Sequence, residues 1–62
     1  MCLSTVFTVC DGVEEKVAEH VTHIAPQAQE IVLTTIMGTK QTVPGRISDI
    51  DLVNNVIRVE RV

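Results

Sequence analysis

The sequence predicts an all-β protein, a small, strongly bent antiparallel barrel of five to six short strands, formed by one domain over residues 1–62. Apolar residues make up 45% of the chain, yet Phe7 is its single aromatic residue, so the core must consist of aliphatic residues, which favour strands. Turn signals separate runs of β-branched residues about every eight to twelve residues, as in small sandwiches and barrels. A chain this short cannot form two separate sheets, so one sheet is expected to bend around its own core.

The first expected strand is LSTVFTV, residues 3–9, which is followed by the turn dipeptide Asp11-Gly12. Successive side chains of a strand point to opposite faces, and the odd positions carry Leu3 and Phe7. The odd face is therefore predicted to form the core. The even positions are then predicted to face solvent or a second subunit: Cys2, Ser4, Val6, Thr8 and Cys10.

Residues 13–25, VEEKVAEHVTHIA, allow two interpretations. With Asp11 as a candidate N-cap, their apolar side chains recur at helical spacing: Val13, Val17, Val21 and Ile24. Residues 21–25 equally fit a short strand that ends at Pro26, and thirteen residues are marginal for an isolated helix. From the residues alone both interpretations stay open.

The rest of the chain predicts strands with clear turns between them. Three β-branched or alternating runs are expected to be strands: residues 30–37, 40–43 and 46–53. Asn54-Asn55 fits a two-residue hairpin loop, because asparagine tolerates the positive φ that such loops need. The last run, residues 56–62, alternates most clearly, with Ile57 and Val59 predicted inward and Arg58 and Glu60 outward.

Charge and hydropathy limit the classes of function. The formal charge is −3, and the five basic residues are scattered singly along the chain. A surface that follows nucleic-acid phosphates needs clustered cations and stacking rings, so nucleic-acid binding is not expected. The sequence lacks an apolar run of about 18 residues and a secretory signal, which predicts a cytoplasmic protein without a membrane span. In that compartment both cysteines are expected to be free thiols.

Cys2 is the main candidate for chemistry, because it directly follows Met1. Its thiolate, its own amide nitrogen and the Met1 amine could chelate one metal ion through fused chelate rings. Such a nitrogen and sulfur donor set favours a square-planar ion, for which Ni(II) and Cu(II) are the usual candidates. The alternative is a solvent-facing cysteine with no metal role.

The other polar residues give weaker signals. His20 and His23 would share one face of a helix, but their odd separation would turn them to opposite faces of a regular strand. Cys10 is interpreted as a partly buried filler, and Asp49 and Asp51 as a solvated strand edge. No nucleophile–base set or metalloprotease motif occurs, so the sequence predicts no enzyme activity and no catalytic residue.

Four segments in order, MCLSTVF, EIVLTTIMG, VPGRI and IDLVNNVIRVE, resemble the CooT-type proteins, small cytoplasmic nickel-binding chaperones linked to maturation of carbon monoxide dehydrogenase. The resemblance covers nearly the whole chain. It implies a homodimer of Sm-like or SH3-like β-barrels that binds Ni(II) near the paired N-termini through Cys2. The donor chemistry of the first two residues adds Met1 as a further nitrogen donor. It also implies that residues 13–25 form a strand, a short turn and another strand, and that the client is a nickel enzyme.

Two features limit this resemblance, and two other functions compete with it. Met37 stands where an aromatic residue is common in the family, and neither His20 nor His23 can be transferred as a ligand. A weaker similarity to the HypC-type hydrogenase-assembly chaperones, which also begin Met-Cys, implies the same use of Cys2. The alternatives are a small RNA-binding barrel and a structural or assembly dimer with no metal role.

Overall fold

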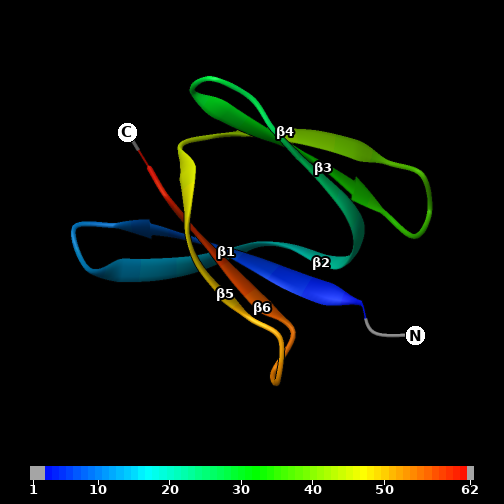
Figure 1. Ribbon diagram of the computed structural model, residues 1–62, viewed down its shortest axis with the longest axis horizontal. Coiled ribbons are helices and arrows are strands. Elements are labelled where there is room, and N and C mark those ends of the chain that lie inside the picture. The colour runs from blue at the N-terminus through cyan, green and yellow to red at the C-terminus, as the bar shows by residue number, and fades with distance from the viewer. Residues whose placement is uncertain (1–2, 62) are drawn as a thin grey trace.

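The computed structural model describes residues 3–61, which form six strands of one sheet (Figure 1). The strands are β1 (Ser4–Cys10), β2 (Val13–Pro26), β3 (Glu30–Thr35), β4 (Lys40–Pro44), β5 (Arg46–Asp51) and β6 (Val56–Glu60). The predicted all-β class is confirmed. Within the described part of the chain no helix occurs that could cross a membrane.

The sheet has the strand order β4-β3-β2-β1-β6-β5 and bends strongly without closing, so that β4 and β5 are its two edges. The predicted barrel is therefore an open one. Four of the five strand pairs are antiparallel, but β1 and β6 are parallel, which the sequence prediction of an antiparallel sheet did not include. This parallel pair places the first and last strands side by side in the middle of the sheet.

Bulges in β2 provide most of the bend. Its register against β1 shifts twice and its register against β3 shifts once, and each shift adds one extra residue to β2. His20, at one of these shifts, has a positive φ of 58°. Bulges bend a strand and increase its twist. The first part of β2 can therefore pair with β1 and its last part with β3, as Figure 1 shows.

The same bulges explain the helical spacing of apolar residues in this segment. Each extra residue changes the alternation, so that side chains three or four positions apart return to the inner face. Ala18 and Val21 are buried and Val17 and Ile24 pack against the core, whereas Val13 is 67% exposed. The helix interpretation is wrong, and so is the implied turn within residues 13–25, because β2 is one continuous strand.

Among residues 3–61 the core consists of eight buried residues, all aliphatic: Val6, Ala18, Val21, Ile31, Leu33, Val43, Ile57 and Val59. The prediction for β1 is wrong, because Val6 and Thr8 point inward and Phe7 is only half-buried on the outer face. The inside of so strongly bent a sheet suits compact β-branched side chains, while the outer face accommodates the ring. The buried Thr8 hydroxyl donates a hydrogen bond to the Glu15 carbonyl oxygen at 3.4 Å.

One residue, Gly45, carries the chain from edge strand β4 to edge strand β5. Its φ of 134° is in a region that other residues rarely adopt. A Cβ at this position would collide with the Glu60 carbonyl oxygen and lie 3.1 Å from the Val59 side chain. Glycine is therefore required where β5 crosses to its place beside β6.

Candidate functional site

The predicted metal ligands, Met1 and Cys2, lie outside the described residues. The structure does describe the surroundings of the start of β1, from Leu3 onward. We call this side of the molecule the leading end: the start of β1 with the β5–β6 turn (52–55) and the β3–β4 turn (36–39). The opposite side, with the end of β1 and the β1–β2 turn (11–12), is the trailing end.

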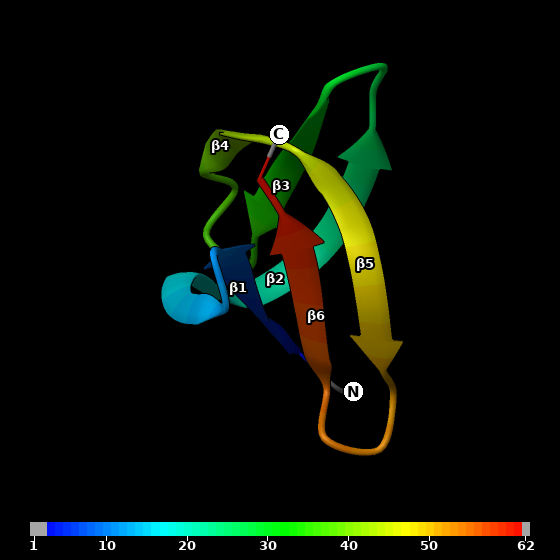
Figure 2. The same cartoon turned by 90° about the vertical axis from the view of Figure 1, so that its left-hand side faces the viewer.

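The β5–β6 turn lies directly beside the start of β1. The Thr5 amide donates a hydrogen bond to the Asn55 carbonyl oxygen at 2.9 Å, and Thr5 is paired with Val56. Because β1 and β6 are parallel, both strands start at the same end of the sheet. The β5–β6 turn, which directly precedes Val56, therefore lies beside the start of β1. Figures 1 and 2 both show this turn projecting beyond the neighbouring strands.

The other neighbour of the leading end is the bent middle of β2. Ser4 pairs with Val21, and the carbonyl oxygen of the preceding residue, His20, accepts a hydrogen bond from the Ile36 amide at 2.9 Å. This bond attaches the β3–β4 turn to the same side of the molecule. The start of β1 is therefore flanked by one turn on each side.

Both histidines lie in this middle part of β2, and both side chains are exposed. The sequence prediction that they would face opposite sides assumed a regular strand. This part of β2 is not regular, because it is bulged on both sides of Val21. Among residues 3–61 no group of three His, Cys, Asp or Glu side chains is placed to hold a metal ion. His20 and His23 alone do not make a site in the described part of the chain.

The β5–β6 turn is longer than predicted and has its own polar support. It spans four residues, Leu52 to Asn55, rather than the dipeptide Asn54-Asn55, although Asn55 does take the expected positive φ of 57°. Asp51 accepts hydrogen bonds from the Val53 amide at 3.0 Å, the Asn54 amide at 3.1 Å and the Asn54 side-chain amide at 2.9 Å. The pKa of Asp51 lies below its ordinary value of 3.8. The hydrogen bond from the Asn54 side chain is the largest cause, and the hydrogen bonds from the turn amides add to it.

Exposed apolar side chains gather at the leading end, a feature that the sequence interpretation missed. Leu52 is 81% and Val53 90% exposed, and Ile50 precedes them at 53%. Ile36 and Met37 of the β3–β4 turn are exposed as well. The available signal was the presence of large apolar residues in turns, where polar residues and glycine are the rule.

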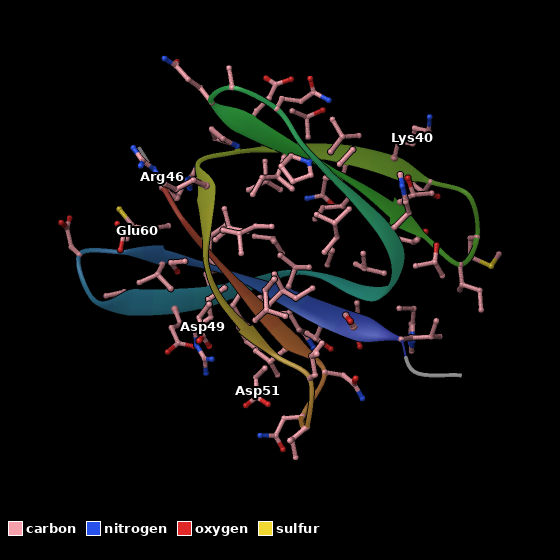
Figure 3. The ribbon with its side chains drawn as sticks, viewed as in Figure 1. Lys40, Arg46, Asp49, Asp51 and Glu60 are labelled. Carbon is pink, nitrogen blue, oxygen red and sulfur yellow. The ribbon has the colours of Figure 1, made fainter. Side chains whose placement is uncertain are left out.

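Charged side chains gather at the trailing end instead. Glu60 pairs with both Val9 and Arg46, and the Arg61 amide donates to the Val9 carbonyl oxygen at 3.1 Å. Figure 3 shows Arg46 and Glu60 together on this side, with Asp49 and Asp51 following β5 toward the other. Asp11, Glu14 and Glu15 add three acids around the β1–β2 turn.

Cys10 closes β1 at this charged end. It is an exposed free thiol, with Sγ 4.0 Å from the Asp11 carboxylate, so the prediction of a partly buried filler is wrong. The reason is that β1 ends at Cys10, and the β1–β2 turn that follows leaves the Cys10 side chain exposed. Cys10 lies at the opposite end of β1 from the residues that precede Leu3.

The carboxylates of β5 have structural partners of their own. Asp49 binds Arg58 at 2.9 Å, and Arg58 also contacts Glu14 at 3.2 Å. The hydrogen bond to Glu14 and the negative charge of Glu14 raise the pKa of the Arg58 guanidinium most, and the hydrogen bond to Asp49 raises it further. Asp51 supports the turn. Both carboxylates are thus engaged in separate structural interactions on the outside of the sheet.

Comparisons with known proteins agree with this fold. A family model described as the CO dehydrogenase accessory protein CooT matches residues 1–60. The crystal structure of a candidate CooT from Carboxydothermus hydrogenoformans is similar with a TM-score of 0.88 and 28% sequence identity, over 98% of each chain. No curated protein matches the chain.

Proposed function

From the premise that the chain belongs to the CooT family of CO dehydrogenase accessory proteins, we propose that it is a nickel chaperone that holds Ni(II) through Cys2 at a homodimer interface. Its role is in the maturation of carbon monoxide dehydrogenase, with the ion as cargo and without catalysis of its own. We place this activity in the cytoplasm, where nickel enzymes are assembled. The observation that carries the proposal is that the family match begins at residue 1 and so includes Met1 and Cys2.

The donor set that supports this proposal is chemically suited to nickel. A deprotonated Cys2 thiolate, its amide nitrogen and the Met1 nitrogen are strong donors for a four-coordinate ion. Residues 3–61 offer no cluster of three metal-binding side chains, so the first two residues are the expected source of ligands. Thiolate and amide ligands must lose protons to bind, and nickel affinity is therefore expected to fall as the pH drops.

A homodimer completes the proposed site. The first two residues of one chain supply a single thiolate, whereas a twofold axis beside the start of β1 brings two Cys2 residues to one ion. The expected stoichiometry is one Ni(II) per two chains. A small domain with a core of eight buried residues also gains stability from a partner subunit.

The test is a titration of Ni(II) into the reduced protein, followed by ultraviolet–visible absorption and native mass spectrometry. Wild type is expected to develop thiolate-to-nickel charge-transfer bands that saturate at one ion per two chains. Cys2→Ser should lose both signals. Cys10→Ser is the matched control, because it removes the exposed thiol at the other end of β1 and should bind nickel as wild type does.

Unchanged nickel uptake by Cys2→Ser would contradict the proposal. Loss of uptake in Cys10→Ser instead would move the site to the trailing end. If only Cys2 matters, transfer of the bound ion to nickel-free carbon monoxide dehydrogenase is the next reaction to follow, with Cys2→Ser as the negative control.

A further inference from the structure

We propose that the free edge of β4 (Lys40–Pro44) is a docking site for an extended, acidic segment of the client protein, which pairs with β4 as an additional strand of the sheet. The inference rests on the proposed function in one respect, that the partner is the client to which nickel is delivered. It adds the surface that holds this client and the chemistry of the segment that binds there.

The backbone of β4 leaves hydrogen-bonding groups unused on its outer side. β4 is an edge of the open sheet, with β3 on one side only (Figure 1). Just before β4 begins, the Thr35 amide donates a hydrogen bond to the Thr39 carbonyl oxygen at 2.9 Å, and the register from there along β4 is regular. Hydrogen-bonded pairs alternate along an antiparallel ladder. The backbone N–H and C=O groups of Lys40 and Thr42 therefore point away from β3.

The other end of the strand agrees with this assignment. The Gly45 amide donates to the Gln29 carbonyl oxygen at 3.0 Å, and these two residues continue the same register. Pro44, which has no N–H to donate, takes an outward position, as proline does in edge strands. An added strand would thus find the N–H donors of Lys40 and Thr42 in a row with their carbonyl groups.

Two cations stand at the two ends of this edge. In the described part of the chain no salt bridge involves Lys40 or Arg46, even though Glu60 lies opposite Arg46 in the register of β5 and β6. Both side chains are exposed, and Figure 3 shows them at opposite ends of β4. Residues 39–46 contain no acid, although the protein carries a net charge of −3. The edge is therefore complementary to a segment with acidic side chains.

The other edge of the sheet, β5, is not suited to such pairing. Its register against β6 shifts between Ile47 and Asp49, and a bulge disturbs the regular row of backbone groups that an added strand needs. Asp49 and Asp51 also lie on this strand and would repel an acidic segment. The contrast between the two edges selects β4.

The position of β4 favours the client over a second copy of the chain. β4 follows the β3–β4 turn of the leading end, so a segment paired with it holds its protein near the end where the ion is proposed to bind. A second copy could offer its own β4, which carries the same cations, or its β5. The acids of β5 are already engaged, Asp49 with Arg58 and Asp51 with its own turn. Neither of these strands supplies a free carboxylate.

The first experiment titrates the isotope-labelled full chain with a synthetic peptide and follows the backbone amides by NMR. The peptide has alternating valine and threonine residues flanked by glutamates, and the matched peptide has lysines in place of the glutamates. The amide signals of Lys40 and Thr42 should shift, and their hydrogen exchange should slow, with the acidic peptide alone. No response, an equal response to the lysine peptide, or a response confined to β5 would overturn the inference.

Two substitutions at Thr42 separate pairing of the backbone from contact of the side chain. Thr42→Pro removes the outward N–H, which the fold does not use, whereas Thr42→Val keeps it. We expect Thr42→Pro to raise the Kd of the acidic peptide about tenfold, because one hydrogen bond and the pairing around it are lost. Thr42→Val should bind as wild type does. Circular dichroism confirms that each variant is folded.

A charge reversal at an exposed position gives a test that does not depend on the backbone. Lys40→Glu should also raise the Kd of the acidic peptide and should bind the lysine peptide instead. Wild-type affinity of the acidic peptide for Lys40→Glu, or for a folded Thr42→Pro, would overturn the inference. So would larger oligomers of wild type that Thr42→Pro abolishes, because a second copy would then occupy the edge.

Nickel-free carbon monoxide dehydrogenase provides the test with the client itself. Wild type and Cys2→Ser, both without metal, should bind it equally, and Thr42→Pro should bind it about tenfold more weakly while taking up nickel as wild type does. If Thr42→Pro binds the client as wild type does and Cys2→Ser loses nickel, the docking site is wrong and the proposed function stands. If Thr42→Pro loses the client and Cys2→Ser binds nickel normally, the docking site stands and the metal ligands are wrong.

Discussion

At its leading end β1 is flanked by two turns with exposed apolar side chains. At its trailing end the surrounding side chains are mostly charged. Leu52 and Met37 mark the first surrounding, Arg46 and Glu60 the second. The two ends belong to one strand of seven residues, so the difference is not one of fold class. It shows that the sheet supplies a common core, while its two ends differ in surface chemistry: exposed apolar side chains gather at one end and charged side chains at the other.

The same substitution, leucine to alanine, compares the common core with the leading end. Leu33 is fully buried in β3, whereas Leu52 is 81% exposed at the leading end. Leu33→Ala should lower the free energy of unfolding by about 3 kcal/mol, because it leaves a cavity in a core of eight residues. Leu52→Ala should change it by no more than about 0.5 kcal/mol.

Urea denaturation at a concentration where the chain is monomeric measures both values. A domain of this size has only a few kcal/mol of stability, so Leu33→Ala is expected to be partly unfolded at 37 °C. Equal effects of the two substitutions would mean that Leu52 belongs to the core.

A second pair of substitutions compares the backbone at the two ends. Gly45 lies at the trailing end against the Glu60 carbonyl oxygen, and Gly45→Ala should cost about 2 kcal/mol or more, because the new Cβ displaces this backbone. Gly38, in the β3–β4 turn, has a φ of 85°, but a Cβ added there would meet no atom within 4 Å, so Gly38→Ala should cost about 1 kcal/mol.

The midpoints of urea unfolding give this difference directly. A Gly38→Ala protein that is less stable than Gly45→Ala would show that the crossing from β4 to β5 tolerates a side chain. In that case the close approach to Glu60 would not be what keeps the two edge strands in place.

The smallest expected effect is the pH dependence of the leading end. Asp51 has a folded pKa below its ordinary value of 3.8, chiefly because of the Asn54 side chain. Its contribution is therefore complete above that value and is lost as the pH falls through the folded pKa. NMR shifts of the Val53 and Asn54 amides should follow this titration. Asp51→Asn should abolish it and Asp49→Asn should not.

A titration of these amides near pH 3.8 or above would contradict the role of Asp51 in the turn.

Much of the fold was predictable from local chemistry. The aliphatic composition and the β-branched runs predicted the all-β class, and the alternation in β6 correctly placed Ile57 and Val59 inside. Asp11-Gly12 forms the expected turn, with φ values of 52° and 79°. These features depend on single residues or on near neighbours, which a sequence displays directly.

The candidate site was predictable only in part. The position of Cys2 after Met1 suggested a metal ligand and the family match covers both residues, but their structure lies outside the described range. The exposed pair Leu52 and Val53 could have been noticed as apolar residues in a turn. The contact of the same turn with Thr5 could not have been noticed, because the parallel pairing of β1 with β6 joins opposite ends of the chain.

The sequence by itself determined that this chain forms strands, where most of its turns lie and which residue is the candidate nickel ligand. Only the tertiary structure decided which face of β1 is buried, why β2 shows a helical spacing and which turn lies beside the start of β1. The physical reason is that bulges change the alternation of side chains and that curvature selects which face is inside. Both depend on partners that are distant in the sequence.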